Sequence, residues 1–203
     1  MRRRESPDSR GNRSFAAPPG PDSFAAHTDL RGTMRQIFWG IAIAALAAGP
    51  ALAHAPAPKI VSISVLEELQ TPLPYPYDES ADANADVNAA FARARAEHKR
   101  VLIDLGGNWC ADCRILAAVM ALPEVKSFLD AHYIMVDVDV GRFDRNLQIP
   151  ARFGITQRLE GVPSILVVDP DGTLIDRGHI SALADARSMT PQALADWLAE
   201  WTK

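Results

Sequence analysis

Residues 101–114, "VLIDLGGNWCADCR", decide the fold of this chain. The apolar run "VLIDL" is typical of a buried strand, and the Gly-Gly-Asn that follows favours a turn. Apolar side chains between Ile115 and Met120 then recur at helical spacing. The stretch therefore predicts a strand that turns directly into a helix, with Cys110 in the first turn of that helix.

The segments on either side continue the alternation of strands and helices. We expect a helix over residues 82–99, a second strand at 133–140, a hairpin built on "SILVV", "DPDG" and "TLIDR", and a last helix capped by Thr190-Pro191. Ile60–Leu66 alternates weakly as a strand would, and three prolines in residues 72–76 predict an extended surface crossing. This order predicts an α/β fold, a central mixed β-sheet with helices on both faces.

The first 53 residues are not expected to belong to this domain. Residues 34–53 have the layout of a secretory signal peptide, with an arginine, an apolar run and a closing Ala-Leu-Ala. A membrane anchor is the alternative, but Gly49-Pro50 breaks the run before it reaches the roughly 20 apolar residues that a span needs. Residues 1–33 lack an apolar period, so we interpret them as a disordered or mis-assigned N-terminal extension. A twin-arginine signal at Arg2-Arg3-Arg4 is the other interpretation.

Cleavage after Ala53 would leave an extended N-terminal segment over residues 54–82 and a folded domain over residues 83–203. The whole chain has 21 basic and 25 acidic side chains, but from His54 onward the numbers are 14 and 21, a net charge of −7. An acidic domain without a basic run is a poor candidate for a nucleic-acid binder. Export would place the domain in a bacterial periplasm, where disulfides persist.

The two cysteines of "WCADC" allow three interpretations. A purely structural disulfide across two residues closes a tiny loop and removes little entropy from the unfolded chain. A metal site needs further ligands, and His54, His98, His132 and His179 are scattered, with His179 the best placed to help. A redox centre fits cysteines at the start of a helix, because unpaired backbone N–H groups and the helix dipole favour a thiolate there.

Three features together resemble the thioredoxin family, over residues 85–203. They are "WCADC" at 109–113, Asp104 six residues before Cys110, and "GVPS" at 161–164 just before the predicted hairpin. The resemblance implies a thioredoxin-like fold and a protein-disulfide oxidoreductase that needs no cofactor and no metal. Its partners would be protein thiols and disulfides, and a monomer is expected because a partner must reach the cysteines.

The resemblance also implies catalytic roles for the matching residues. Cys110 would be the nucleophile, Cys113 would resolve the mixed disulfide, and Asp104 would move protons for Cys113. The family often places a lysine near this aspartate from the next strand, and here we expect Met135 near that place. The alternative for Asp104 is a carboxylate that backbone groups satisfy at the end of a strand.

Substrate-binding roles follow from the same resemblance for Trp109, Val162 and Pro163. Pro163 matches the cis-proline opposite the cysteines, Val162 would pair its backbone with an extended substrate segment, and Trp109 would shape the rim. The alternatives are a trans proline at the start of a strand and a plain core aromatic. Residues 179–189, "HISALADARSM", are longer than the turn of thioredoxin and are interpreted as an insertion that shapes the substrate groove.

The residues inside the motif bear on the direction of electron flow. Asp112 adds a negative charge beside Cys110 and should destabilise its thiolate, whereas Arg114 would point away on a regular helix. We therefore expect a reductant, recharged by a membrane thiol reductase. The alternatives are a binding module that holds copper or another thiophilic metal through the two cysteines, and a structural adaptor whose cysteines stay oxidised.

Overall fold

β1 (Arg100–Gly106) is the central strand of the sheet in residues 54–203, the part of the chain that the computed structural model describes. β2 (Tyr133–Asp139) lies parallel to β1 on one side, and β3 (Ser164–Val168) lies antiparallel on the other. Every residue of β1 after Arg100 is buried, so the strand shows no alternation of polar and apolar side chains. The predicted mixed sheet is therefore confirmed.

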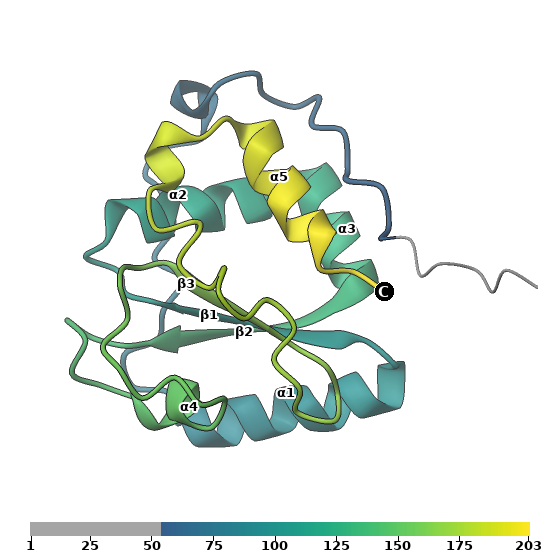
Figure 1. Cartoon of the computed structure of the whole chain (residues 1–203). Coiled ribbons are helices and arrows are strands. Elements are labelled where there is room, and N and C mark those ends of the chain that lie inside the picture. Colours follow the sequence, from purple (N-terminus) through teal and green to yellow (C-terminus); the bar gives the residue numbers. More distant parts are fainter. Residues whose placement is uncertain (1–53) are drawn as a thin grey trace, which may run out of the picture. The chain divides into compact units, whose positions relative to one another are not determined.

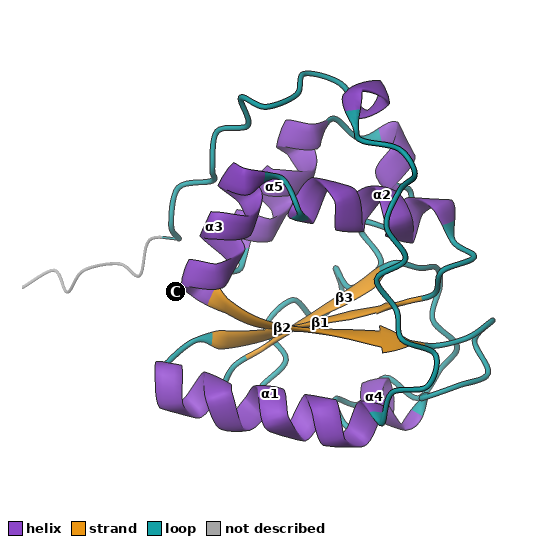
Figure 2. Ribbon diagram, turned by 180° about the vertical axis from the view of Figure 1, so that it is seen from behind, coloured by secondary structure: helices purple, strands orange, loops and turns teal. Residues whose placement is uncertain are grey.

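Helices cover both faces of this sheet, as predicted (Figures 1 and 2). One face carries α1 (Ala83–Glu97) and the short α4 (Gln148–Ala151). The other face carries α2 (Ala111–Met120), α3 (Pro123–His132) and α5 (Pro191–Glu200). Two single 3-10 turns, η1 (Leu66–Glu68) and η2 (Ala186–Ser188), lie in the connecting segments.

A hydrophobic core lies on each side of the sheet. Val87, Ala90 and Ala94 of α1 pack against one face, and Leu116 of α2 and Leu198 of α5 pack against the other. Burying one such leucine or valine side chain contributes about 1.5–3 kcal/mol, so the two cores hold the helices to the sheet. The apolar residues that recur at helical spacing in the sequence are therefore the ones that face the core.

The helix starts follow the capping residues of the sequence. The Asp82 carboxylate accepts the backbone N–H groups of Asn84 and Ala85, both at 3.0 Å, and fixes the start of α1. Thr190 accepts the N–H of Ala193 at 3.1 Å and precedes Pro191, the first residue of α5. Both starts were predicted from the sequence.

The strand predicted at Ile60–Leu66 does not form. This stretch belongs to the N-terminal arm, residues 54–82, which runs around the layer of α2, α3 and α5 (Figures 1 and 2). The N–H of Ile60 donates to the Gln192 side chain at 3.0 Å, and the N–H groups of Val61 and Ser62 donate to Glu124 at 2.8 and 2.9 Å. Side chains of α3 and α5 thus satisfy the backbone that a neighbouring strand would otherwise pair.

The predicted hairpin forms only in part. Its turn is present, since the N–H of Gly172 donates to the Asp169 carbonyl at 2.8 Å and Gly172 has a positive φ of 96°. Beyond the turn, one bridge joins Val168 to Leu174 and no second strand follows. The buried carboxylate of Asp176 accepts the N–H of Val167 at 3.1 Å, so a side chain replaces the next rung of the ladder.

The signal peptide predicted at residues 34–53 and the extension predicted at residues 1–33 lie outside the described residues. Within residues 54–203, none of the helices has the length and apolar character that crossing a bilayer requires.

Candidate active site

Cys110 is the N-cap residue of α2, directly after the turn that leaves β1. Its Sγ accepts the backbone N–H of Cys113 at 3.1 Å. The pKa of Cys110 is lowered to about 7, chiefly by hydrogen bonding from Cys113, while burial opposes the shift. The pKa of Cys113 is raised instead, first by its hydrogen bond to Cys110 and then by burial. One thiol is therefore ready to ionise near neutral pH, and the other holds its proton.

Solvent exposure also distinguishes the two cysteines. Cys110 is 6% exposed, whereas Cys113 is fully buried, and both are free thiols in this structure. Only the N-terminal cysteine of the pair can therefore meet a partner first. Cys110 lies at the start of α2, as the sequence predicted, and Cys113 lies in the first turn of that helix.

Asp104 lies on β1 and is fully buried. Its Oδ1 accepts the hydroxyl of Tyr77 at 3.0 Å, and its Oδ2 has no hydrogen-bond partner among residues 54–203. Burial raises the pKa of Asp104 well above its usual range, and the nearby charge of Asp137 adds to the shift. Backbone groups do not satisfy this carboxyl, so the structural alternative for Asp104 is not what the structure shows.

Tyr77 is the residue of this site that the sequence did not reveal. It belongs to the proline-rich part of the arm, which we expected at the surface, yet it is 2% exposed. A Cβ added to Gly106 would overlap the Tyr77 hydroxyl and lie 2.9 Å from the Cys113 sulfur. The hydroxyl and the sulfur thus line the same small space, next to the carboxyl of Asp104. No local pattern marks Tyr77, because its partner lies 27 residues away.

The neighbour expected for Asp104 on the next strand was wrong. The register of β1 with β2 places Asp137 opposite Asp104, and Met135 opposite Leu102 instead. A second acid therefore takes the position beside Asp104, where an apolar side chain was expected. A carboxylate at this place favours the protonated form of Asp104, whereas a lysine would favour the ionised form.

Val162 and Pro163 lie against the nucleophile. The peptide bond between them is cis, as the motif predicted, and the trans alternative is wrong. The Val162 carbonyl lies 3.3 Å from the Cys110 sulfur, within reach of a thiol proton. The structure thus brings the two cysteines next to Val162 and Pro163, which follow them by about 50 residues along the chain.

Trp109 forms part of the rim and does not belong to a core, since it is 44% exposed. Its ring N–H donates to the Gly141 carbonyl at 2.7 Å, Arg142 stacks on its face at 4.6 Å, and Phe143 contacts its edge at 6.2 Å between ring centroids. The loop after β2 therefore holds Trp109 beside Cys110.

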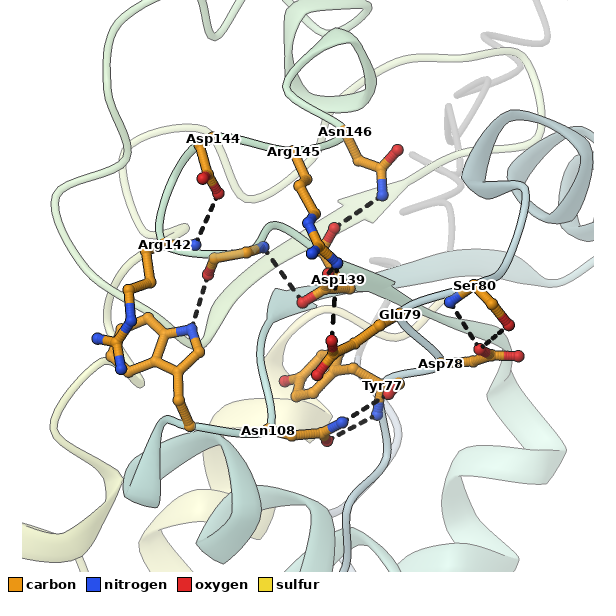
Figure 3. A network of polar contacts seen from close by, with 12 residues as sticks. Tyr77, Asp78, Glu79, Ser80, Asn108, Asp139, Arg142, Asp144, Arg145 and Asn146 are labelled. Carbon is orange, nitrogen blue, oxygen red and sulfur yellow. Dashed lines mark hydrogen bonds and ion pairs between the residues drawn. The ribbon is translucent and has the colours of Figure 1, made fainter.

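A polar network keeps this loop and the arm in place (Figure 3). Asp139 accepts from Arg145 at 3.1 Å and from the N–H of Gly141 at 3.1 Å. Asn108 exchanges two hydrogen bonds with the backbone of Tyr77, at 3.2 and 2.7 Å. The turn between β1 and α2 thus fixes the Tyr77 backbone directly.

Of the two charged residues in and beside the cysteine motif, Arg114 lies as predicted and Asp112 does not. Arg114 points away from Cys110, as predicted: it stacks on Tyr75 at 3.9 Å and donates to the Leu73 and Pro74 carbonyls. Asp112, however, is not an unpaired charge. Arg187 of η2 binds its carboxylate through Nε at 2.9 Å. Burial would raise the pKa of Asp112, but the hydrogen bonds from Arg187 outweigh it and lower that pKa.

A closed metal site would need further ligands beside the two cysteines. Among residues 54–203, no group of three or more His, Cys, Asp or Glu side chains is arranged to hold a metal ion. His179 is exposed, and its ring lies against that of Trp201 at 5.4 Å between centroids. The site instead combines a thiol of lowered pKa, a buried second thiol and a buried acid.

Comparisons with known proteins agree with this geometry. A family model described as thioredoxin-like matches residues 82–170. A disulphide isomerase from Xylella fastidiosa Temecula1 is 37% identical, with a TM-score of 0.58, and the match covers 63% of this chain and 97% of that chain. The C-terminal domain of DsbD from Neisseria meningitidis in its oxidised form is 25% identical, with a TM-score of 0.36, over 47% of this chain and 80% of that chain. A search of curated proteins found no match. On its fold, its motif and its solved relative, the chain belongs to the thioredoxin-like family.

Proposed function

We propose that this protein exchanges disulfides with other proteins through Cys110 and Cys113. The observation that carries the proposal is the asymmetry of the pair: the pKa of Cys110 is lowered to about 7 at the start of α2, and Cys113 is buried behind it. The 37% identical disulphide isomerase from Xylella fastidiosa Temecula1 supports the same chemistry.

In the first step, the Cys110 thiolate attacks one sulfur of a substrate disulfide. The new Cys110–substrate bond forms as the substrate S–S bond breaks, and the departing sulfur takes up a proton. In the second step, Cys113 loses its proton and attacks Cys110, which releases the second substrate thiol. The protein ends as a disulfide and the substrate as a dithiol, so two electrons have moved.

Asp104 has a defined task in the second step. Cys113 must lose its proton in a buried space, and the carboxyl of Asp104 together with the Tyr77 hydroxyl lies at that space. Because burial raises its pKa, the ionised form of Asp104 is a stronger base than a free carboxylate, and its unpaired Oδ2 can take the proton. Trp109, Val162 and Pro163 form the surface around Cys110 on which we propose that an extended substrate segment binds.

Insulin reduction tests the proposal. The reduced protein should precipitate insulin by reducing its disulfides, Cys110→Ser should abolish this activity, and Cys113→Ser should accumulate mixed disulfides with substrates because nothing resolves them. Mass spectrometry of the trapped species gives the measurement. An active Cys110→Ser variant, or trapping by Cys110→Ser alone, would reverse the assignment of the two roles.

We further propose that the protein acts as a reductant after export to the periplasm, and that a membrane thiol reductase recharges it. Arg187 pairs with Asp112, so the negative charge of Asp112 no longer supports this direction. The support is now the pKa of Cys110: about 7 resembles thioredoxin, whereas the strong oxidant of the family has a value near 3.5. The signal peptide predicted over residues 34–53 supports the location.

A further inference from the structure

Asp112 stands inside the cysteine motif, and an arginine far along the chain holds its charge. Its carboxylate is 7% exposed. Arg187, 75 residues later, donates Nε to Oδ1 at 2.9 Å and to Oδ2 at 3.1 Å, and a second guanidinium nitrogen also reaches Oδ2. We propose that Arg187 is a positioning residue for the exchange reaction, because it neutralises Asp112 and thereby keeps the thiolate of Cys110 stable. The inference rests on the proposed role of Cys110 as the nucleophile.

The geometry separates the charge of Arg187 from its structural role. The backbone N–H of Arg187 also donates to Asp112, at 2.9 Å, and Ala186 and Leu183 beside it are fully buried. Removing only the guanidinium therefore leaves η2 attached to α2 through its backbone and its apolar neighbours. The Arg187 side chain itself is 56% exposed, so its loss opens no cavity in the core.

The balance of charges around Cys110 explains why this pair matters. The titratable groups that face its sulfur are Asp104, Asp112, Cys113 and Arg187. The pKa values of Asp104 and Cys113 are both raised, which disfavours a negative charge on either group. The negative charge of Asp112 disfavours a thiolate at Cys110. Arg187 is the cation that pairs with Asp112 and offsets this charge. Without Arg187, an unpaired buried carboxylate would stand in the same helical turn as the nucleophile.

The test measures alkylation of Cys110 by iodoacetamide between pH 5 and 9 in the reduced full domain, with the modified peptide identified by mass spectrometry. Arg187→Ala should raise the midpoint by about half to one pH unit, the size expected for one unscreened charge near a half-buried site. Alkylation at pH 6 should slow about three- to tenfold, because one pH unit is a factor of ten. Arg187→Lys should restore part of the effect, since it keeps the charge and loses the two-pronged contact.

Two matched variants show whether Arg187 acts through Asp112. Asp112→Asn removes the negative charge that Arg187 offsets. Adding Arg187→Ala to this variant should therefore shift the midpoint of Cys110 alkylation little. Arg114→Ala removes an arginine of α2 whose guanidinium contacts Tyr75 and two arm carbonyls, and it should leave the midpoint unchanged. An unshifted midpoint in Arg187→Ala would overturn the inference, and so would an equal shift in the Asp112→Asn background.

The readout does not depend on the proposed function. If Arg187→Ala shifts the alkylation midpoint but the wild type does not reduce insulin, the inference stands and the proposed function fails. If the wild type reduces insulin and the midpoint does not move, the proposed function stands and the inference fails.

Discussion

Asp104 is an acid placed on the central strand β1. It is fully buried, one of its oxygens accepts from Tyr77, and the other is unpaired in the described part of the chain. Because burial raises its pKa, the folded protein keeps a proton there that the unfolded chain releases at pH above about 3.8. The contribution of this group to stability is therefore present below that value and is lost as the pH rises toward the folded pKa.

Asp104→Asn should remove this loss. The amide has the same shape and can still accept from Tyr77, but it does not titrate. The free energy of unfolding of the variant, relative to wild type, should grow between pH 5 and pH 8 by at most about 1.4 kcal/mol per pH unit. Urea unfolding at several pH values gives the measurement, and release of the trapped substrate should be slower in the variant.

Asp171→Asn is the matched control for that experiment. Asp171 is exposed, and hydrogen bonds from Thr173 lower its pKa, so its replacement should not show a gain that grows with pH. Parallel pH profiles for Asp104→Asn and wild type would mean that the pKa of Asp104 is not raised in the folded protein, which would contradict the effect of its burial.

Sequence patterns located the residues that stand in short motifs, those of the distant GVPS segment included, and missed those that stand in none. Cys110, Cys113 and Asp104 lie within ten residues, so one strand–turn–helix unit determines their arrangement. Tyr77 and Arg187 reach the site across 27 and 75 residues, and neither stands in a local motif. Their positions depend on how the arm and η2 pack, which no short-range period encodes.

Among the elements, the N-terminal arm is held by single polar side chains as well as by apolar contacts. Glu124 at the start of α3 accepts the N–H groups of Val61 and Ser62 and the Ser62 hydroxyl, at 2.8, 2.9 and 2.7 Å. These hydrogen bonds lower the pKa of Glu124 to about 2. The attachment is therefore complete above the usual carboxyl pKa of 4.5 and weakens as the pH falls toward 2.

Glu124→Ala should release the first part of the arm without unfolding the domain. Two backbone N–H groups lose their acceptor, so proteolysis within residues 54–70 should become several-fold faster. Asp130→Ala is the matched control, because its carboxylate on the same helix pairs only with Lys126, also at the surface. Insulin reduction should persist, since Asn108 holds Tyr77 independently. Equal cleavage of the two variants would mean that Glu124 does not secure the arm.

The errors made for elements have a common physical cause. Alternation of polar and apolar residues predicted strands at Ile60–Leu66 and after the turn at Gly172, but a strand also needs a neighbouring backbone. In both places a carboxylate or amide side chain supplies the hydrogen bonds instead: Glu124 and Gln192 for the arm, and Asp176 after the turn. The buried strands β1, β2 and β3 were correct because their apolar runs require cover on both faces.

For the whole molecule, the reduction potential and the stability of its two redox forms are linked. A strongly stabilised thiolate makes the reduced form the more stable one, whereas the mild shift of Cys110 to about 7 favours the disulfide form. We expect a potential nearer to about −270 mV than to about −120 mV, and an oxidised form that resists urea better than the reduced form. Equilibration with glutathione measures the first quantity. A potential above about −160 mV, or a more stable reduced form, would identify an oxidant instead.

The two ends of the described part of the chain, residues 54–203, lie together at the start of β1. The N–H of Ala55 donates to the Thr202 hydroxyl at 2.7 Å, and Arg100, the first residue of β1, reaches the Thr202 carbonyl at 3.2 Å. The cysteines follow the opposite end of that strand, about 20 Å away at the usual rise per residue. A flexible tether of n residues, attached at His54 or Lys203, would therefore hold the domain at the end opposite the cysteines. The root-mean-square length of such a tether is about 5–6 Å × √n, and Cys110 would stay accessible to a partner within that reach.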